Sequence, residues 1–267
     1  MKTIKVNNTN QFKDAVKNSD AGDTIIMQPG EYFSNKRSEV LTIDKTLTIE
    51  GQYINAKAVK LNCAFIVSNN VTLIMKNLFM TSNDDHFNTL ALYDNAELFG
   101  DNIIVDRDNT KYNGGWDTIF AKDAAVSLTN SDIVADRGSN HIGLSLENSQ
   151  SMITDSNIYG LCLNNATAYL KNVLISYAIV LLKHSTLSYI DLALDSLCNK
   201  DSDFYIADNS TVNGMNLKIV KKEPFIDVIG SKFQNDIFTN DSTGIRWCFD
   251  DASIILIDGK TPYNSGL

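Results

Sequence analysis

Pairs of an Asn or Asp followed by an aliphatic residue recur along most of this chain. Successive pairs lie 15 to 30 residues apart, a spacing typical of a solenoid in which each coil consists of a few short strands and bends. The sequence is therefore that of a repeat protein. The pairs are Asn77-Leu78, Asn102-Ile103, Asp132-Ile133, Asn157-Ile158, Asn172-Val173, Asp191-Leu192, Asn216-Leu217 and Asp236-Ile237.

A second pattern, of two apolar residues at positions i and i+2, precedes a polar turn in nearly every repeat. Because side chains of a strand alternate between its faces, both members of such a pair are expected to point into a core. Thr118 and Phe120 fill one remaining slot less well. The pairs are Phe65/Val67, Leu90/Leu92, Leu144/Leu146, Leu161/Leu163, Val180/Leu182, Phe204/Ile206, Ile226/Val228 and Trp247/Phe249.

The turns after these pairs are rich in Asn and Asp, as in Ser68-Asn69-Asn70 and Asp208-Asn209-Ser210. Both residue types tolerate left-handed backbone conformations and hydrogen-bond their own backbone. Stacked Asn side chains can also form a ladder between coils. We therefore interpret these residues as structural, with His184 substituting for Asn or Asp in one turn.

Residues 1–55 differ from the repeats and form an N-terminal cap and first coil, whereas residues 56–267 form the remaining coils of one continuous domain. Residues 11–18 predict a short amphipathic helix with Phe12, Ala15 and Val16 on its apolar face and Asn10 as N-cap. Strand patterns follow over residues 21–32 and 41–51. Such a helix would cover the first exposed coil of a solenoid.

This order, a helix followed by Gly22–Tyr32 and Leu41–Gly51, resembles the capped beginning of right-handed parallel β-helix proteins of the pectin-lyase-like superfamily. The resemblance covers the whole chain. It implies an all-β fold, a right-handed parallel β-helix solenoid with a short N-terminal capping helix. Polysaccharide lyases, hydrolases and epimerases, phage tailspikes and surface proteins share this fold, so the resemblance implies no single activity.

Catalytic motifs of that superfamily match this sequence only in part. Pectate lyases combine acidic calcium ligands with an Arg or Lys base, epimerases carry Asp-Pro-His-Glu, and polygalacturonases carry Asn-Thr-Asp, Asp-Asp and Gly-His-Gly. The sequence lacks Asp-Pro-His-Glu, and Asp84-Asp85-His86 and Asp250-Asp251 are its partial matches to the polygalacturonase set. Whether the protein is an enzyme is therefore left open.

Three longer insertions, residues 81–88, 105–117 and 134–141, occupy equivalent positions in consecutive coils and are expected to stack on one flank. Loops of this kind carry function more often than the scaffold does. We predict that Asp84, Asp106 and Asp136 act as acid, base or calcium ligands. Carboxyl groups about 5 Å apart suit a retaining glycosidase and wider pairs an inverting one, whereas a solvated Asp-Arg ladder is the structural alternative.

The remaining candidate residues of the flank are basic or aromatic. Arg107 and Arg137 would neutralise the charge of a sugar, and His86 could act as an acid or base near neutral pH. Tyr112, Trp116 and His141 are the predicted ligand-binding residues, since an exposed aromatic ring can stack on a sugar, although Trp116 could equally fold back over the core.

Composition restricts the partners and the location. The net charge of −9 excludes nucleic acid, which needs clustered Lys and Arg. No stretch has the roughly 18 apolar residues of a membrane-spanning helix, and no apolar signal-peptide segment follows Met1, which favours a cytoplasmic or phage-derived protein. The dispersed cysteines are expected to be free thiols. They are Cys63, Cys162, Cys198 and Cys248.

Two functions fit the sequence. One is a carbohydrate-binding or polysaccharide-processing β-helix, dependent on Ca²⁺ if the carboxylates form a metal site. The alternative is a non-catalytic structural or adhesion scaffold that binds a protein partner or assembles with itself. The apolar segment Ser253–Ile257 near the C-terminus predicts either a tail that folds back or a contact in a homo-oligomer.

Overall fold

The computed structural model describes residues 1–33, 39–83, 87–107, 116–135, 142–195, 202–220, 224–240 and 244–263. These residues form two compact units, Met1–Leu144 and Ser145–Leu267. Each unit is described by itself below. The predicted division into a cap over residues 1–55 and one continuous domain over residues 56–267 stays a prediction.

Unit 1 contains one α-helix, a single 3-10 turn and short parallel strands in its described part. The helical elements are α1 (Thr9–Asn18) and η1 (Ala56–Ala58). The strands are β1 (Thr3–Val6), β2 (Thr24–Met27), β3 (Gly30–Tyr32), β4 (Glu39–Ile43), β5 (Leu47–Gly51), β6 (Val59–Val67), β7 (Thr72–Ser82), β8 (Leu90–Leu92), β9 (Glu97–Arg107), β10 (Ile119–Lys122), β11 (Ala125–Thr129) and β12 (Asp132–Ile133).

Unit 2 consists of strands and turns throughout its described part. The strands are β13 (Leu144–Glu147), β14 (Gln150–Ile158), β15 (Leu161–Asn164), β16 (Thr167–Ile175), β17 (Ile179–Leu182), β18 (Thr186–Leu194), β19 (Phe204–Ile206), β20 (Thr211–Ile219), β21 (Phe225–Val228), β22 (Lys232–Asn240), β23 (Arg246–Phe249) and β24 (Ile254–Ile257).

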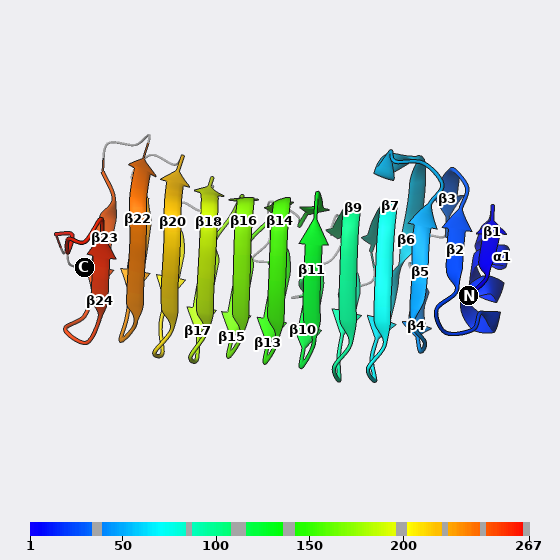
Figure 1. The fold of residues 1–267 in the computed structure, drawn as a ribbon, viewed down its shortest axis with the longest axis horizontal. Coiled ribbons are helices and arrows are strands. Elements are labelled where there is room, and N and C mark those ends of the chain that lie inside the picture. The colour runs from blue at the N-terminus through cyan, green and yellow to red at the C-terminus, as the bar shows by residue number, and fades with distance from the viewer. Residues whose placement is uncertain are drawn as a thin grey trace. The chain divides into compact units, whose positions relative to one another are not determined.

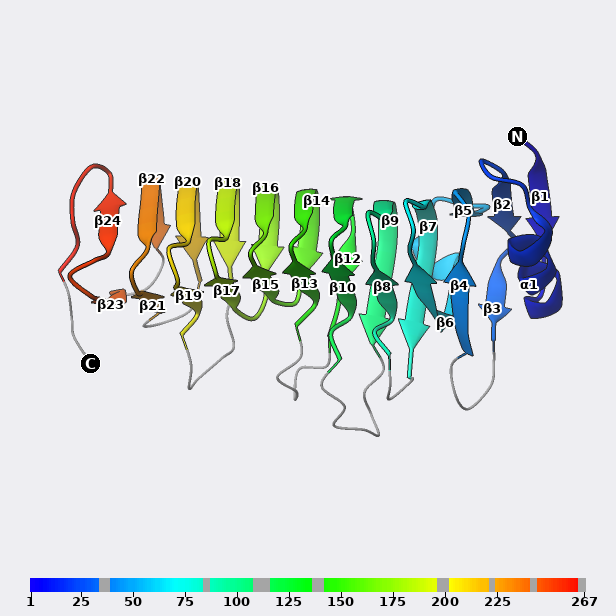
Figure 2. The same cartoon turned by 90° about the horizontal axis from the view of Figure 1, so that it is seen from below.

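Within each unit, strands pair in parallel with the equivalent strand one coil further along the chain. Long strands such as β7 and β9, or β16 and β18, form sheet A, and short strands such as β8 and β10, or β15 and β17, form sheet B. Figures 1 and 2 show these two rows of strands in each unit. One coil thus contributes a short strand, a turn and a long strand, as a parallel β-helix requires.

Most of the predicted apolar pairs point into the core. Phe65/Val67, Leu90/Leu92, Leu161/Leu163, Phe204/Ile206 and Ile226/Val228 are fully buried, which confirms the inside and outside of these coils.

Two predicted pairs were wrong by one residue. The buried pair of β17 is Ile179/Leu181 and not Val180/Leu182, and the buried pair of β10 is Ile119/Ala121 and not Thr118/Phe120. The register explains both, because Ile179 pairs with Leu161 of β15 and Ile119 pairs with Leu90 of β8. A shift of one residue exchanges the two faces of a strand, so the pairing with the neighbouring coils decides which residues are buried.

The long strands bend at a residue in the left-handed backbone region. Five of the predicted Asn and Asp positions have this conformation, with φ between 52° and 62°. They are Asn77, Asn102, Asn172, Asp191 and Asn216.

At the other three motifs the bend lies at a different residue. Asn130 and Asp155 bend the chain with φ of 51°, two residues before Asp132 and Asn157. Asp236 pairs with Met215, one residue before the bend at Asn216. In each case the sequence motif lies near the bend, and the register with the adjacent coil identifies the bend residue.

Side chains at these bends form the predicted ladder. Asn102 donates from Nδ2 to Oδ1 of Asn77 at 2.8 Å in unit 1, and Asn172 donates to Oδ1 of Asp155 at 2.7 Å in unit 2. Each bond joins two coils at the point where the strand bends, so one residue type supplies both the unusual backbone conformation and a contact along the stack.

The N-terminal helix covers the first coil, as predicted. Phe12, Ala15 and Val16 are buried, and Phe12 lies 6.4 Å from the ring of Phe65. The N-cap is Asn8 and not Asn10, because the Asn8 side chain accepts a hydrogen bond from the Gln11 N–H at 3.0 Å. The helix therefore starts two residues earlier than the sequence pattern predicted.

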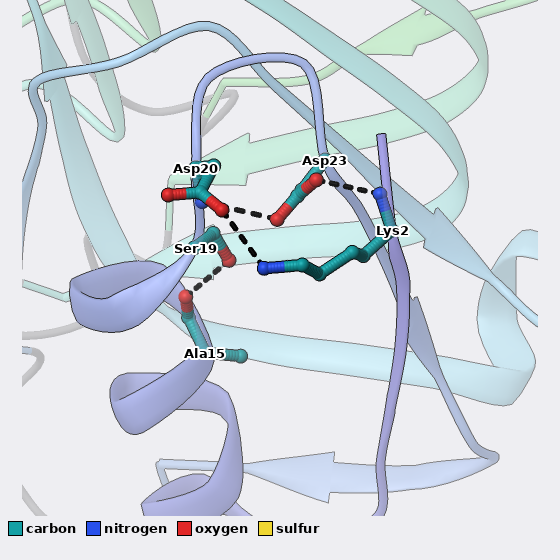
Figure 3. Close-up of polar contacts among 5 residues, drawn as sticks. All are labelled: Lys2, Ala15, Ser19, Asp20 and Asp23. Atoms are coloured by element: carbon teal, nitrogen blue, oxygen red, sulfur yellow. Dashed lines mark hydrogen bonds and ion pairs between the residues drawn. The ribbon is translucent and has the colours of Figure 1, made fainter.

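A network of hydrogen bonds joins the end of α1 to β1 (Figure 3). Asp23 accepts hydrogen bonds from the backbone N–H groups of Lys2 at 2.6 Å and Asp20 at 3.0 Å, and these bonds lower the pKa of its carboxyl group. Lys2 Nζ contacts Asp20 Oδ2 at 2.9 Å, and Ser19 Oγ donates to the Ala15 carbonyl. The cap is thus tied to the first strand by backbone donors.

The described part of the C-terminal segment folds back after β24. Ile257 and Lys260 form an antiparallel bridge in which both N–H···O distances are 2.8 Å. Ile254, at the start of β24, is 51% exposed. The fold-back that the sequence predicted as one alternative is confirmed here, and an oligomer contact stays a prediction.

Within the described ranges, no helix combines the length and apolar character needed to cross a membrane. Cys63, Cys162 and Cys248 are free thiols, whereas Cys198 lies outside the described residues.

The bend positions can be tested by comparing two residues of β14. Asp155→Ala should lower the free energy of unfolding by about 2 kcal/mol, because it removes the Asn172 hydrogen bond and places Ala in the left-handed region. Asn157→Ala changes an exposed residue of the same strand that has extended backbone, so it should cost less than half as much. Urea unfolding of both variants measures the difference; equal losses would contradict the assigned register.

Candidate functional site

Three of the nine predicted site residues fall within the described part of the chain: Asp106, Arg107 and Trp116. The other six lie outside the described residues, so their roles stay predictions. They are Asp84, His86, Tyr112, Asp136, Arg137 and His141.

Asp106 and Arg107 end the long strand β9. In the preceding coil they pair with Thr81 and Ser82 of β7. In the following coil Ile133 pairs with Val105, so the chain reaches the level of Asp106 at Val134, two residues before Asp136. The residues at the level of Asp106 are therefore Thr81, Asp106 and Val134 in the described part, of which Thr81 is buried and Val134 is exposed.

Arg107 is buried, with 2% of its surface exposed. Its guanidinium donates a hydrogen bond to the backbone carbonyl of Phe87. Separately, the backbone N–H of Arg107 donates to Asp106 Oδ1 at 2.7 Å. A buried cation needs such acceptors because it has left water. Arg107 thus joins the end of sheet A to the segment that enters sheet B, and a direct contact with a sugar stays a prediction.

Two exposed aromatic residues occupy equivalent positions in consecutive coils. Leu90 of β8 pairs with Ile119 of β10, so Phe87 and Trp116, each three residues earlier, lie at the same level of the coil. Phe87 is 40% exposed and Trp116 41% exposed. Neighbouring parallel strands are about 4.8 Å apart, so the two rings are presented from adjacent coils of the same flank. The exposed ring of Trp116 is available to solvent.

Amide and carboxylate groups connect these coils directly beside the aromatic residues. Asn88 donates from Nδ2 to the carbonyl of Asp117 at 2.8 Å. The side chain of Asp117 accepts from the N–H of Ile142 at 3.0 Å. Ile142 directly follows His141 in the sequence, and Asp117 directly follows Trp116. The contacts therefore join Asn88 and Asp117, the residues that directly follow Phe87 and Trp116, to the next coil.

Buried hydroxyl groups secure the same corner against sheet A. Thr89 Oγ1 donates to the carbonyl of Asp106 at 2.8 Å, and Thr118 Oγ1 donates to the carbonyl of Val134 at 2.7 Å. Both threonines are fully buried. We call residues 87, 88, 106, 107, 116 and 117 the loop-base flank. Its two exposed rings belong to segments that are hydrogen-bonded to the end of sheet A.

The predicted flank included Phe87, Asn88 and Asp117 within its insertions, but sequence reasoning did not single them out as site residues. The signal was present as a repeated order of aromatic residue, Asx, Thr and aliphatic residue, in Phe87–Leu90 and again in Trp116–Ile119. The insertions on either side hide it, because their lengths differ.

A second group of interest, also missed from the sequence, lies on the outer side of sheet B in unit 2. Asp227 pairs with Tyr205 in the preceding coil and with Cys248 in the following coil. The Cys248 thiol is near enough to the Asp227 carboxylate to act on its pKa, in the lowering direction. The buried Oδ1 atom of Asp227 has no hydrogen-bond partner among the described residues.

Burial raises the pKa of Asp227, and the nearby negative charge of Asp250 acts in the same direction. The pKa of Asp250 itself is lowered by the Ser253 hydroxyl and by backbone donors that include the Gly230 N–H at 3.0 Å. Two carboxyl groups of one surface thus have opposite shifts. Such a separation is found at acid–base sites but also in structural networks.

A calcium site at the loop-base flank stays a prediction, because Asp84 and Asp136 lie outside the described residues. Among the residues that the structure does describe, no three His, Cys, Asp or Glu side chains are close enough to hold a metal ion together. Asp106 is the described member of the predicted calcium ligands.

None of the protein-family models matches the sequence, and no curated protein sequence matches it either. Solved structures do match. Similarity to an alginate lyase from Paenibacillus sp. str. FPU-7 has a TM-score of 0.52 at 11% identity and covers 95% of this chain and 99% of that chain.

Two further structures are similar over most of this chain. The PL6 family alginate lyase AlyGC has a TM-score of 0.40 at 14% identity, covering 96% of this chain, which spans 40% of the length of that chain. A pectin methylesterase from Aspergillus niger has a TM-score of 0.30 at 13% identity and covers 94% of this chain and 81% of that chain.

At this level of identity the similarity shows the fold. The chain has a right-handed parallel β-helix fold with a short N-terminal capping helix, which confirms the predicted fold class.

The raised pKa of Asp227 gives a pH-dependent contribution to stability. The folded state disfavours the charged carboxylate, so this group should lower the free energy of unfolding as pH rises from the ordinary Asp pKa of about 3.9 through its raised folded value. Asp227→Asn removes this titration. Urea unfolding at several pH values measures the free energy of unfolding of both proteins. As pH rises from the ordinary to the raised pKa of Asp227, the variant should become more stable relative to wild type. A pH-independent difference would contradict the assignment.

Proposed function

We propose that this protein binds a polysaccharide along the loop-base flank of unit 1 and processes it there. The observation that carries the proposal is the pair of exposed rings, Phe87 and Trp116, at one level of consecutive coils beside the carboxylates of Asp106 and Asp117. Aromatic rings stack on the apolar faces of sugars, and carboxylates accept hydrogen bonds from sugar hydroxyls.

A repeating scaffold suits a repeating ligand. Equivalent positions recur at the spacing of strands, so consecutive coils can contact consecutive parts of one elongated chain. The similarity of fold to an alginate lyase supports a polysaccharide as the ligand class.

Processing would need an acid and a base at this flank. Asp84, Asp106 and Asp136 remain the proposed carboxyl groups, with His86 as the alternative acid or base and Arg137 as the cation opposite a charged sugar. Arg107 contributes by holding the Phe87 segment through its buried guanidinium. Calcium bridging by the carboxylates would offset the net charge of −9 toward an anionic polysaccharide.

The aromatic pair can be tested against a matched residue of the same unit. Phe87→Ala and Trp116→Ala should each weaken binding about tenfold, equivalent to about 1.4 kcal/mol. Phe99 is 45% exposed on the outer side of sheet A, so Phe99→Ala should leave binding unchanged.

Affinity electrophoresis in alginate, polygalacturonate and neutral glycans, with and without calcium, measures these effects. Absence of wild-type binding in every gel, or equal losses in Phe99→Ala and Trp116→Ala, would refute the proposed function.

A self-assembling scaffold is the second candidate, favoured by the 51% exposed Ile254 on β24. β24 pairs with β22 along one edge, and an exposed apolar strand edge can accept a strand from another copy. The C-terminal coil is thus the proposed contact of a homo-oligomer.

Sedimentation velocity over a range of concentrations tests this contact. Wild type should associate as concentration rises, and Ile254→Lys should sediment as a monomer, because a charge on the edge opposes strand pairing. A wild-type monomer at every concentration would exclude assembly through this coil.

A further inference from the structure

Unit 2 has a surface recess of about 460 Å³ on the turns that lead from sheet B to sheet A. This volume lies within the range of about 300 to 1,000 Å³ that is common for small-ligand sites. Its lining consists entirely of polar and charged residues. They are Glu147, Asn148, Asn164, Asn165, Lys183, His184, Asp208 and Asn209.

Differences in turn length produce the recess. The turns after β13 and β15 contain only residues 148–149 and 165–166, whereas the turns after β17 and β19 contain residues 183–185 and 207–210. The short turns have one left-handed residue each, Asn148 and Asn165. The long turns have two in succession and extend further from the strands. The short turns therefore form the floor, and the long turns form a wall.

The floor is a pair of amides that are held in place. Asn165 donates from Nδ2 to Oδ1 of Asn148 at 2.8 Å, across adjacent coils. Asn164, at the end of β15, pairs with Leu182 of β17 and is half-buried. Each amide side chain offers both donors and an acceptor, which a sugar hydroxyl can use in either sense.

The wall carries both signs of charge. His184 donates its backbone N–H to the carbonyl of Asp208 at 2.8 Å, which joins the two long turns. Lys183 is cationic, whereas Asp208 on the wall and Glu147 at the floor are anionic. One positive and two negative charges leave the recess slightly negative, which disfavours an anionic ligand.

Other ligand classes fit this lining less well. An apolar ligand would leave the amides and charges without partners, at a cost for each polar group that it covers. In the described part of the chain, no three metal-ligating side chains gather, so a metal ion finds no ready set of ligands here. A ligand with many hydroxyl groups and no net charge satisfies every group of the lining.

We infer that this recess binds a neutral saccharide through hydrogen bonds to the floor amides of Asn148, Asn164 and Asn165 and to the Lys183–Asp208 wall. The inference is independent of the proposed function of the loop-base flank, because the two surfaces share no residue and differ in chemistry. Stacking aromatic rings define the flank, whereas the recess recognises hydroxyl groups by amides.

His184 makes the recess directly observable. The chain has three histidines, at positions 86, 141 and 184, and His184 lies in the wall of the recess. Its imidazole Hε1 signal in proton NMR is assigned by the His184→Asn variant, which retains a residue type suited to the left-handed turn. The probes are cellotetraose, mannotetraose and laminaritetraose, with tetragalacturonate as the charged comparison.

At least one neutral tetrasaccharide should shift the His184 signal in a saturable manner. Asn164→Leu should weaken this binding at least tenfold, because it removes an amide from the lining of the recess. The coil should tolerate leucine at this position, because Asn164 pairs with Leu182 in the next coil. Asn213→Leu makes the same change at an exposed position of β20 outside the recess and should leave binding unchanged.

Three results would overturn the inference: no shift with any neutral probe at millimolar concentration, equal binding by Asn164→Leu and wild type, or tighter binding of tetragalacturonate than of the neutral probes. The double variant Phe87→Ala/Trp116→Ala separates the two sites, since it should lose polysaccharide binding at the flank and retain the His184 shift. Loss of both in that variant would also refute independent sites.

Discussion

The parallel hydrogen-bond ladder between one strand and its equivalent in the next coil is the constraint on which the rest of each unit depends. A strand such as β18 pairs with β16 before it and β20 after it, residue for residue. Every coil must therefore bend at the same level. Asn and Asp meet this requirement, because they accept the left-handed conformation and their side chains bond to the coil alongside.

The same ladder explains why the candidate sites are columns of side chains. Equivalent residues of successive coils lie one strand spacing apart, so a short sequence pattern repeated twice becomes a continuous surface. Phe87 and Trp116 are brought together in this way although 29 residues separate them in the sequence. The buried Arg107 and the two threonines at positions 89 and 118 then hold the loops at the edge of that surface.

Variation between coils, and not the repeat itself, creates the chemistry of the surface. The loop-base flank arises where insertions leave the end of sheet A, and the recess arises where two short turns precede two long ones. The parallel β-helix fold, which is similar to that of an alginate lyase, supplies the scaffold for both. An activity must still be argued from the side chains that a given set of loops presents, since one fold supports many functions.

The sequence alone determined the repeat, the fold class and the capping helix, because these depend on local periodicity that survives without knowledge of the partners. It also indicated the flank, since the insertions that carry Asp106, Arg107 and Trp116 stand out by length. The pairing between coils decided what the sequence could not. The bend near the Asn157-Ile158 pair is at Asp155, and Ile179 and not Val180 faces the core.

These differences have one physical reason. Side chains alternate with a period of two, so a shift of a single residue reverses inside and outside, and only the hydrogen bonds to the adjacent strands fix that register. The burial of Arg107, the level shared by Phe87 and Trp116, and the recess beside His184 all follow from register and turn length. They are consequences of contacts between coils, which a linear pattern of residues does not contain.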